Sequence, residues 1–112
     1  MSAKVTLTLA EAGRVPKEFV FEKATRSVVG RAEDCDIRLP GQEHPFISRH
    51  HCEFDIDPPE VRVRDLWSRN GTFVNGEKLQ PVEAEQIGEQ ELKNGDEVRL
   101  GNTVLRIGTI VS

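Results

Sequence analysis

The chain has 112 residues and a formal net charge of −4, and its residues are 37% hydrophobic and 30% charged. A chain of this length buries one core more readily than two, so we expect a single domain over residues 1–112. The acidic balance weighs against nucleic acid as a partner, because nucleic-acid binding proteins carry basic surfaces. No apolar run reaches the ~18 residues that a membrane-spanning helix needs.

The beginning of the chain alternates polar and apolar residues and lacks the continuous apolar stretch of a signal peptide. Its only two cysteines, Cys35 and Cys52, are too few for the disulfide framework of a small secreted domain. We therefore expect a cytoplasmic, intracellular protein without a membrane partner. Both cysteines are expected to be free and buried, as small hydrophobic side chains.

Hydrophobic residues recur with a period of two along most of the chain, which is typical of strands with one buried face. In chain order, this pattern predicts strands at residues 5–9, 18–22, 27–30, 51–56, 61–65, 72–74, 97–100 and 103–107. No long window carries the apolar stripe of an amphipathic helix, and residues 81–90 are compatible with a helical turn only.

Turn dipeptides lie beside these strands and favour tight turns with positive φ. They are Asn70-Gly71, Asn75-Gly76, Asn94-Gly95 and Gly101-Asn102. The run Asp57-Pro58-Pro59 separates two further strands, because proline cannot continue a hydrogen-bonded ladder. Short strands with regular turns predict an all-β fold, and we favour an antiparallel β-sandwich over a barrel.

Several predicted loops contain side chains suited to binding an oxyanion. Arg31 and Arg49 have guanidinium groups that can bind two phosphate oxygens at once. Ser48 has a hydroxyl donor, and the Asn70 amide can both donate to and accept from a peptide backbone. Each of these residues alone is a weak signal.

Four sequence blocks in a fixed order make the signal specific. They are Gly30-Arg31, Ser48-Arg49-His50-His51, the run NGTFVNG at residues 70–76, and the run LKNGDEVRLG at residues 92–101. With this order and spacing, residues 5–107 resemble the forkhead-associated (FHA) family. The resemblance implies a SMAD/FHA-like antiparallel β-sandwich of about eleven strands, which binds phosphothreonine peptides through loops at one end.

The resemblance also implies roles for individual residues of the binding loops. Arg31 is similar to the arginine that binds the phosphate, and Ser48 to the hydroxyl that bonds a phosphate oxygen. Asn70 is similar to the residue that holds the peptide main chain beside the phosphothreonine. Arg49 and Arg69 stand where family members line the phosphate or the threonine methyl group.

Other residues of the same blocks are expected to support the loops. Gly30 is similar to a glycine that shapes its turn, and His51 to a histidine that braces the loops from beneath. Gly71 and Thr72 are expected to support the loop that carries Asn70. Selectivity for residues that flank the phosphothreonine is expected from residues 40–47, including an apolar preference from Phe46, and from the region beyond residue 75.

Two features depart from the family pattern. Trp67 stands where the family often has a small or polar residue, so its ring either is partly exposed near the ligand or packs in the core or at the edge of the sandwich. The segment at residues 83–91 is strongly acidic, which fits a solvated connection. It could also repel acidic peptides and so contribute to specificity.

A metal site or a catalytic site is not expected. His44, His50, His51 and the two cysteines show no spacing of a metal site, and adjacent histidines on a strand point to opposite faces. Ser48, His51 and Asp65 are residue types of a hydrolytic triad, but the nucleophile elbow is missing. We therefore expect no metal, no cofactor and no enzymatic activity.

The sequence thus predicts a phosphothreonine-dependent protein–protein recognition module that docks a kinase-phosphorylated partner. The expected partner is a protein phosphorylated on threonine, either a Ser/Thr kinase or its substrate, and the module is expected to be a monomer. The alternative is a β-sandwich that interacts or self-associates without phosphate. Retention of both Arg31 and Ser48 disfavours that alternative.

Overall fold

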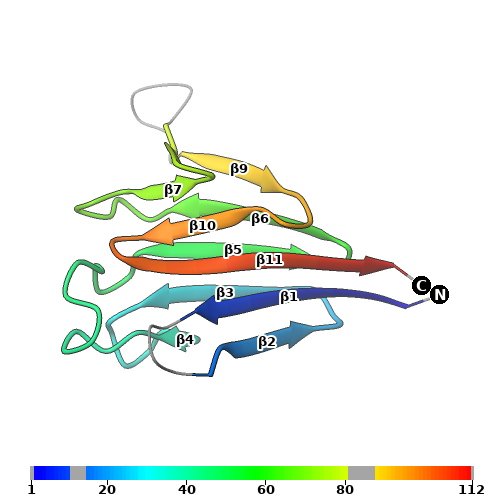
Figure 1. Cartoon of the computed structure of the whole chain (residues 1–112), viewed down its shortest axis with the longest axis horizontal. Coiled ribbons are helices and arrows are strands. Elements are labelled where there is room, and N and C mark those ends of the chain that lie inside the picture. Colours follow the sequence, from blue (N-terminus) through cyan, green and yellow to red (C-terminus); the bar gives the residue numbers. More distant parts are fainter. Residues whose placement is uncertain (1, 11–14, 81–87, 112) are drawn as a thin grey trace.

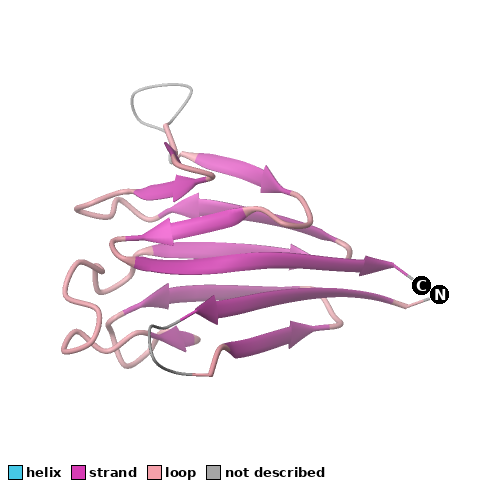
Figure 2. Cartoon of the chain, viewed as in Figure 1, coloured by secondary structure: helices cyan, strands magenta, loops and turns pink. Residues whose placement is uncertain are grey.

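The computed structural model describes residues 2–10, 15–80 and 88–111. This part of the chain consists of strands joined by turns and loops, and none of it is helical (Figure 2). Its eleven strands are β1 (Ala3–Ala10), β2 (Lys17–Phe21), β3 (Thr25–Gly30), β4 (Ile37–Arg38), β5 (Cys52–Asp57), β6 (Glu60–Asp65), β7 (Thr72–Val74), β8 (Glu77–Lys78), β9 (Glu89–Leu92), β10 (Glu97–Leu100) and β11 (Thr103–Val111).

The strands form two sheets that pack face to face as a sandwich (Figure 1). The six-stranded sheet has the order β2-β1-β11-β10-β7-β8, and the five-stranded sheet has the order β4-β3-β5-β6-β9. The short β4 pairs in parallel with β3, and the other strand pairs within the described residues are antiparallel. The predicted all-β sandwich is confirmed.

The two ends of the sandwich differ in what they carry (Figure 1). At one end lie the chain termini, where Ala3 of β1 pairs with Val111 of β11. At the opposite end lie the loops that follow β3, β4, β6 and β10. All four sequence blocks of the predicted binding site therefore contribute to this second end, which we call the loop end.

Alternating residues of each strand fill the space between the sheets. Leu7 of β1 and Leu105 of β11 come from the six-stranded sheet, while Phe54 of β5 and Val63 of β6 come from the five-stranded sheet, and all four are fully buried. Phe54 is among the largest of the fully buried side chains. Because such residues are removed from water on both sheets, the sandwich is a rigid support for its loops.

The outer face of the five-stranded sheet carries a regular array of opposite charges. Cross-strand neighbours alternate in sign along two rows, and these residues form what we call the charge lattice: Arg26, Asp55, Arg62 and Glu91 in one row, and Glu53, Arg64 and Glu89 in the other. Arg64 is within ion-pair distance of two carboxylates, Glu53 at 3.5 Å and Glu89 at 3.3 Å. The arginines of this face thus have acidic neighbours of their own.

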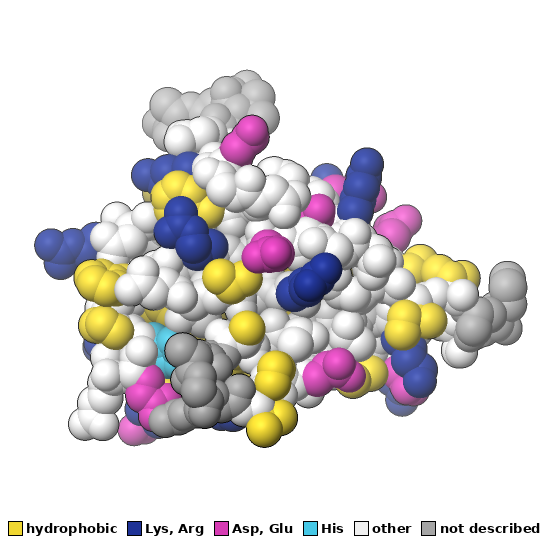
Figure 3. All heavy atoms as spheres, in the orientation of Figure 1, with side chains coloured by type: hydrophobic (Ala, Val, Ile, Leu, Met, Phe, Trp, Pro, Cys, Tyr) yellow, Lys and Arg dark blue, Asp and Glu magenta, His cyan; other side chains and the backbone are white. Residues whose placement is uncertain are grey.

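The face of the six-stranded sheet has charges of both signs scattered among apolar side chains (Figure 3). There, the Arg99 guanidinium of β10 lies over the Phe73 ring of β7, 4.3 Å from its centroid. This is a cation–π contact between neighbouring strands. No helix in the ranges described could cross a membrane.

All eight predicted strands are present, and their ends lie within two residues of the predicted ones, except that β11 extends four residues further. The sequence missed β4, β8 and β9. Most of residues 81–90 lies outside the described ranges, but Glu89 and Gln90 belong to β9, so a helical turn is wrong there. The pattern misled because β9 is an edge strand in which only Leu92 is buried.

The predicted turn glycines are confirmed. Gly71, Gly95 and Gly101 have φ of 88°, 91° and 59°, respectively. In the hairpin between β7 and β8, both Asn75 (φ 49°) and Gly76 (φ 88°) have positive φ, as a type I′ turn requires.

Candidate functional site

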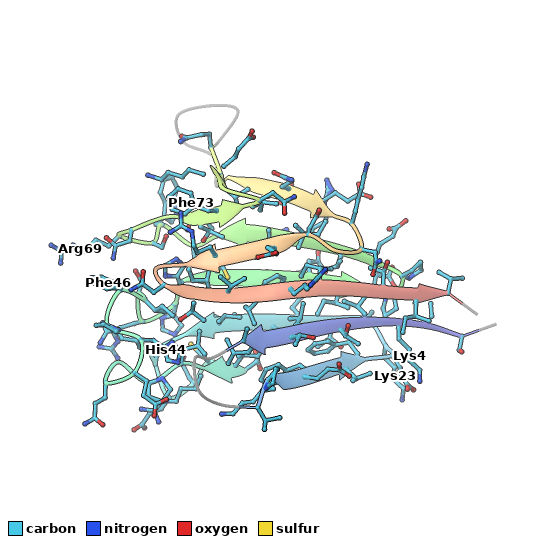
Figure 4. All side chains as sticks on the ribbon, in the orientation of Figure 1. Lys4, Lys23, His44, Phe46, Arg69 and Phe73 are labelled. Carbon is cyan, nitrogen blue, oxygen red and sulfur yellow. The ribbon has the colours of Figure 1, made fainter. Side chains whose placement is uncertain are left out.

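Residues from three loops meet around one surface cavity of about 370 Å³ at the loop end. Arg31 follows β3, Ser48 belongs to the loop between β4 and β5, and Asn70 belongs to the loop between β6 and β7. The remaining lining residues are Pro45, Phe46, Ile47 and Arg69. Figure 4 shows Phe46 and Arg69 at this end of the sandwich.

Arg31 is held by both its backbone and its side chain. Its backbone N–H donates to the Ser48 carbonyl at 3.1 Å, and its Nε donates to the Ile47 carbonyl at 2.8 Å. The Nε bond orients the guanidinium plane and leaves the terminal Nη groups to bind a ligand. No carboxylate of the described residues forms an ion pair with this guanidinium.

Gly30 permits the close approach that positions Arg31. A Cβ atom at Gly30 would lie 2.1 Å from the Arg49 carbonyl oxygen and 2.7 Å from its carbonyl carbon. Next to this contact, the Ala32 N–H donates to the same Arg49 carbonyl at 3.0 Å. A side chain at position 30 would therefore force apart the loops that carry Arg31 and Ser48.

Ser48 has a hydroxyl that is fixed as an acceptor and remains available as a donor. Its Oγ accepts a hydrogen bond from the Arg69 backbone N–H at 3.0 Å. The hydroxyl hydrogen can then point toward an anion in the cavity. This bond also ties the loop of Ser48 to the loop of Arg69 and Asn70.

His51 lies buried beneath these loops and joins two of them. Its Nδ1 accepts a hydrogen bond from the Ser48 N–H at 3.1 Å, and its Nε2 donates to the Gly71 carbonyl at 2.9 Å. This bonding pattern assigns the ring proton to Nε2. Burial lowers the pKa of His51, partly offset by the Gly71 carbonyl and by Asp65, so the ring is kept neutral.

These bonds do not make a hydrolytic triad of Ser48, His51 and Asp65. Both ring nitrogens of His51 are engaged by backbone groups, so the imidazole is not placed to take a proton from the Ser48 hydroxyl. The Asp65 carboxylate is used elsewhere, in the loop between β6 and β7.

Asp65 organises that loop through a network that sequence reasoning missed. Its carboxylate accepts from the Ser68 hydroxyl, from the Ser68 N–H at 3.1 Å and from the Thr72 hydroxyl at 2.8 Å. The Ser68 Oγ in turn accepts from the Gly71 N–H at 3.0 Å. The spacing of Asp65 and Ser68, three residues apart, is a sequence signal for such an Asx-type turn.

Asn70 and Phe46 are fixed to each other across two loops. The Asn70 Nδ2 donates to the Phe46 carbonyl at 2.9 Å, which leaves Oδ1 to accept from a ligand backbone. Phe46 is 50% exposed. Its backbone is nevertheless held in place, since its Cβ lies close to Gly101. A half-exposed aromatic ring on a fixed backbone presents an apolar wall to the cavity.

Arg49 lies apart from the other sequence-predicted site residues. It lines a neighbouring cavity of about 450 Å³ with Ala32, Glu33 and Asp34, and Arg31 lines both cavities. Ser48 and Arg49 are adjacent in the chain, and their side chains border different cavities. The structure thus brings together four of the five predicted ligand residues and places the fifth beside them.

Trp67 is 65% exposed, so its packing in the core is wrong, and it is not among the residues that line the cavity. It has a positive φ of 58° at the point where the chain turns back from Asp65 to Ser68. That turn directs the ring into solvent. Cys35 and Cys52 are free and buried, as predicted.

The FHA domain family model matches residues 27–101, which span all four loops of the loop end. The chain belongs to the FHA family. It is similar to the glycogen accumulation regulator GarA of Mycolicibacterium smegmatis, with 35% identity over 100 residues, which are 89% of this chain and 56% of GarA. This FHA chain thus spans about half the length of that curated relative.

Solved FHA structures have the same architecture. The FHA domain of CT664 from Chlamydia trachomatis superposes with a TM-score of 0.82 at 24% identity, covering 96% of this chain and 99% of that one. The yeast Dun1 FHA domain, solved with a doubly phosphorylated (pT) peptide, has a TM-score of 0.71 at 27% identity. That match covers 99% of this chain and 77% of the Dun1 chain.

Proposed function

We propose that this FHA domain binds proteins phosphorylated on threonine and acts as a docking module in signalling. The observation that carries the proposal is the convergence of Arg31, Ser48 and Asn70 on one cavity in which Arg31 has no acidic partner among the described residues. The yeast Dun1 domain, which has the same fold, was solved with a phosphothreonine peptide, and this supports the proposal.

The phosphate is bound by donors that are already oriented. The Nη groups of Arg31 bind two phosphate oxygens, and the Ser48 hydroxyl donates to a third. Each hydrogen bond to a charged group contributes about 1.5–3 kcal/mol. Because the Nε bond and the Ser48–Arg69 bond preset these side chains, we expect little rearrangement on binding.

The peptide backbone and its flanking residues use the rest of the cavity. The Asn70 Oδ1 accepts an N–H of the peptide main chain, and a small apolar niche near Arg69 and Asn70 takes the threonine methyl group and so favours threonine over serine. Pro45 and Phe46 form the apolar wall, so a peptide with an apolar residue next to the phosphothreonine is preferred. Arg49 adds positive potential from the neighbouring cavity without direct contact.

Several further properties belong to this proposal. The partner is a Ser/Thr kinase or a substrate of one, the module binds its partner and catalyses no reaction, and it acts as a monomer inside the cell. One FHA domain occupies residues 1–112, and the pairing of β1 with β11 supports this extent.

A titration with matched peptide libraries tests the proposal. Fluorescence polarisation is measured with a degenerate phosphothreonine library and with the corresponding threonine and phosphoserine libraries. Saturable binding to the phosphothreonine library alone supports the proposal. Equal binding to all three libraries, or to none, contradicts it and favours the alternative of an interaction domain that does not use phosphate.

A further inference from the structure

A second group of side chains with metal-ligand chemistry lies next to the phosphopeptide cavity. Asp34 and Cys35 belong to the loop between β3 and β4, and His50 stands just before β5. One carboxylate oxygen, the Cys35 Sγ and one ring nitrogen of His50 all lie within 4.8 Å of one another. The proposed phosphopeptide contacts use none of these three side chains.

Existing contacts already hold these ligand atoms near one another. The His50 Nε2 lies 2.8 Å from Asp34 Oδ1 and 3.1 Å from Oδ2, so the imidazole and the carboxylate face each other. The Cys35 thiol donates to the Arg49 carbonyl at 3.1 Å, which holds the sulfur within 4.8 Å of this pair in the absence of a metal. Three different types of ligand atom, O, N and S, therefore converge from two loops.

We propose that Asp34, Cys35 and His50 bind a zinc ion. Zinc bonds of about 2.0–2.3 Å to N, O and S in a tetrahedral arrangement place the ligand atoms roughly 3.5 Å apart. The present spacing of up to 4.8 Å requires a shift of about one ångström. Asp34 and His50 have side chains 74% and 47% exposed, so they can rotate inward toward the Cys35 sulfur, which gives up its hydrogen bond to the Arg49 carbonyl when the thiol loses its proton.

Zinc binding requires each of the three side chains to present a deprotonated ligand atom. The Cys35 thiol releases its proton to solvent and binds as the thiolate, while Asp34 binds as the carboxylate that it already is. His50 donates the Nε2 lone pair to the metal, which leaves a ring proton on Nδ1 and ends its hydrogen bond to Asp34. A water molecule completes the coordination, because Asp34 borders the open cavity of about 450 Å³.

The sequence predicted no metal site, because its histidines and cysteines do not show the spacing of known metal sites. The tertiary structure nevertheless brings Cys35 and His50 together. Cys35 and His50 are fifteen residues apart, and they meet because the N–H groups of residues 31 and 32 donate to the carbonyls of residues 48 and 49. The inference does not depend on phosphopeptide binding, since it uses different side chains.

Cobalt substitution tests the site with a direct spectroscopic readout. The reduced, metal-free protein is titrated with Co²⁺, and the thiolate-to-cobalt charge-transfer band and the visible bands are recorded, followed by displacement with Zn²⁺. The variants are Cys35→Ser, which removes the thiolate, His50→Ala, which removes the imidazole, and Cys52→Ala as the matched control. Thermal unfolding of each variant checks that it is folded.

The expected result is one cobalt ion per chain, with a thiolate band in the wild type and in Cys52→Ala and no such band in Cys35→Ser. We also expect His50→Ala to weaken the binding of both cobalt and zinc at least tenfold. The proposal is overturned if the folded wild type shows no thiolate band, if the band persists in Cys35→Ser, or if His50→Ala binds zinc as the wild type does.

Discussion

Arginines occur in two regions of this FHA domain in opposite electrostatic settings. In the charge lattice, Arg62 and Arg64 each face acidic residues on both neighbouring strands. At the loop end, Arg31 and Arg69 form no ion pair with any carboxylate in the described ranges. The chain as a whole has a net charge of −4, so acidic partners are not scarce. Arginines that lie on fixed loops without acidic partners indicate a surface that binds an anion from another molecule.

The two regions also differ in the free energy that a single arginine contributes. An exposed ion pair on a sheet contributes about 0–1 kcal/mol, because water screens it and long side chains lose freedom. A preoriented guanidinium that binds phosphate contributes about 1.5–3 kcal/mol for each hydrogen bond. Removing lattice arginines should therefore change stability slightly, and removing loop-end arginines should change binding strongly.

The largest effect is expected from Gly30→Ala. The new Cβ would meet the Arg49 carbonyl oxygen at 2.1 Å, and neither a Cβ, which is fixed to its Cα, nor a backbone carbonyl can rotate away. We expect phosphopeptide binding to be lost and the free energy of unfolding to fall by about 1–3 kcal/mol, as overpacking does. Peptide titration and chemical denaturation measure the two effects.

Gly95→Ala is the matched control for that substitution. Gly95 has φ of 91° in the turn between β9 and β10, away from the loop end, and no atom would lie within 4 Å of an added Cβ. Its variant should lose some stability through backbone strain yet bind peptide as the wild type does. Normal binding by Gly30→Ala would show that loop approach does not position Arg31.

A smaller effect is expected from pH, through His51. Burial lowers the pKa of His51 in the folded protein, whereas the unfolded chain binds the proton near the ordinary pKa of about 6.5. Below that pH the unfolded state binds more protons than the folded state. The contribution of His51 to the free energy of unfolding is therefore complete above about pH 6.5 and is lost as the pH drops. Protonation would also break the bond from the Ser48 N–H.

Denaturation curves at several pH values, for the wild type and for His51→Gln, measure this contribution. The glutamine amide does not titrate, so the wild type should lose more stability than the variant between about pH 7 and pH 5. Parallel losses in the two proteins would mean that His51 does not couple the loop end to pH.

Phe46→Ala should change selectivity more than overall affinity. The half-exposed ring lines the cavity, so its removal should weaken peptides with an apolar flanking residue by about three- to tenfold, near 1 kcal/mol. Peptides with a polar residue there should change little. Val20→Ala, another 50% exposed apolar residue but on β2, is the control that should change neither class. A uniform loss across all peptides would assign Phe46 a structural role only.

The smallest effect is expected from Arg64→Ala in the charge lattice. It removes ion pairs to Glu53 and Glu89 on a partly exposed sheet face, so the free energy of unfolding should fall by less than about 1 kcal/mol. Added salt should reduce the difference further. A loss that is larger and insensitive to salt would contradict the assignment of these pairs to a screened surface.

Much of the fold could be predicted from alternation and turn dipeptides, because each long strand has one buried face and each Asn-Gly pair forces a turn. β4 and β8 have two residues each, and β9 buries only Leu92, so none of them shows a periodic pattern. Their pairing depends on neighbours that are distant in the sequence.

Arg31, Ser48 and Asn70 could be predicted as site residues because four sequence blocks occur in the order and spacing of the FHA family, although each residue alone is a weak signal. The supporting bonds could not be predicted, because they join residues far apart in the chain. His51 bridges Ser48 and Gly71, and Asp65 orders its loop through Ser68 and Thr72. The separation of Arg49 into a neighbouring cavity likewise depends on tertiary packing.

The most direct test of the central claim compares the removal of an arginine from each of the two regions in one experiment. A phosphothreonine peptide selected from the library is titrated against the wild type, Arg31→Ala and Arg62→Ala, with the unphosphorylated peptide as reference. We predict that Arg31→Ala weakens binding at least tenfold, about 1.4 kcal/mol, while Arg62→Ala leaves it within about twofold. Equal weakening by both substitutions, or equal binding of the unphosphorylated peptide, would contradict the account.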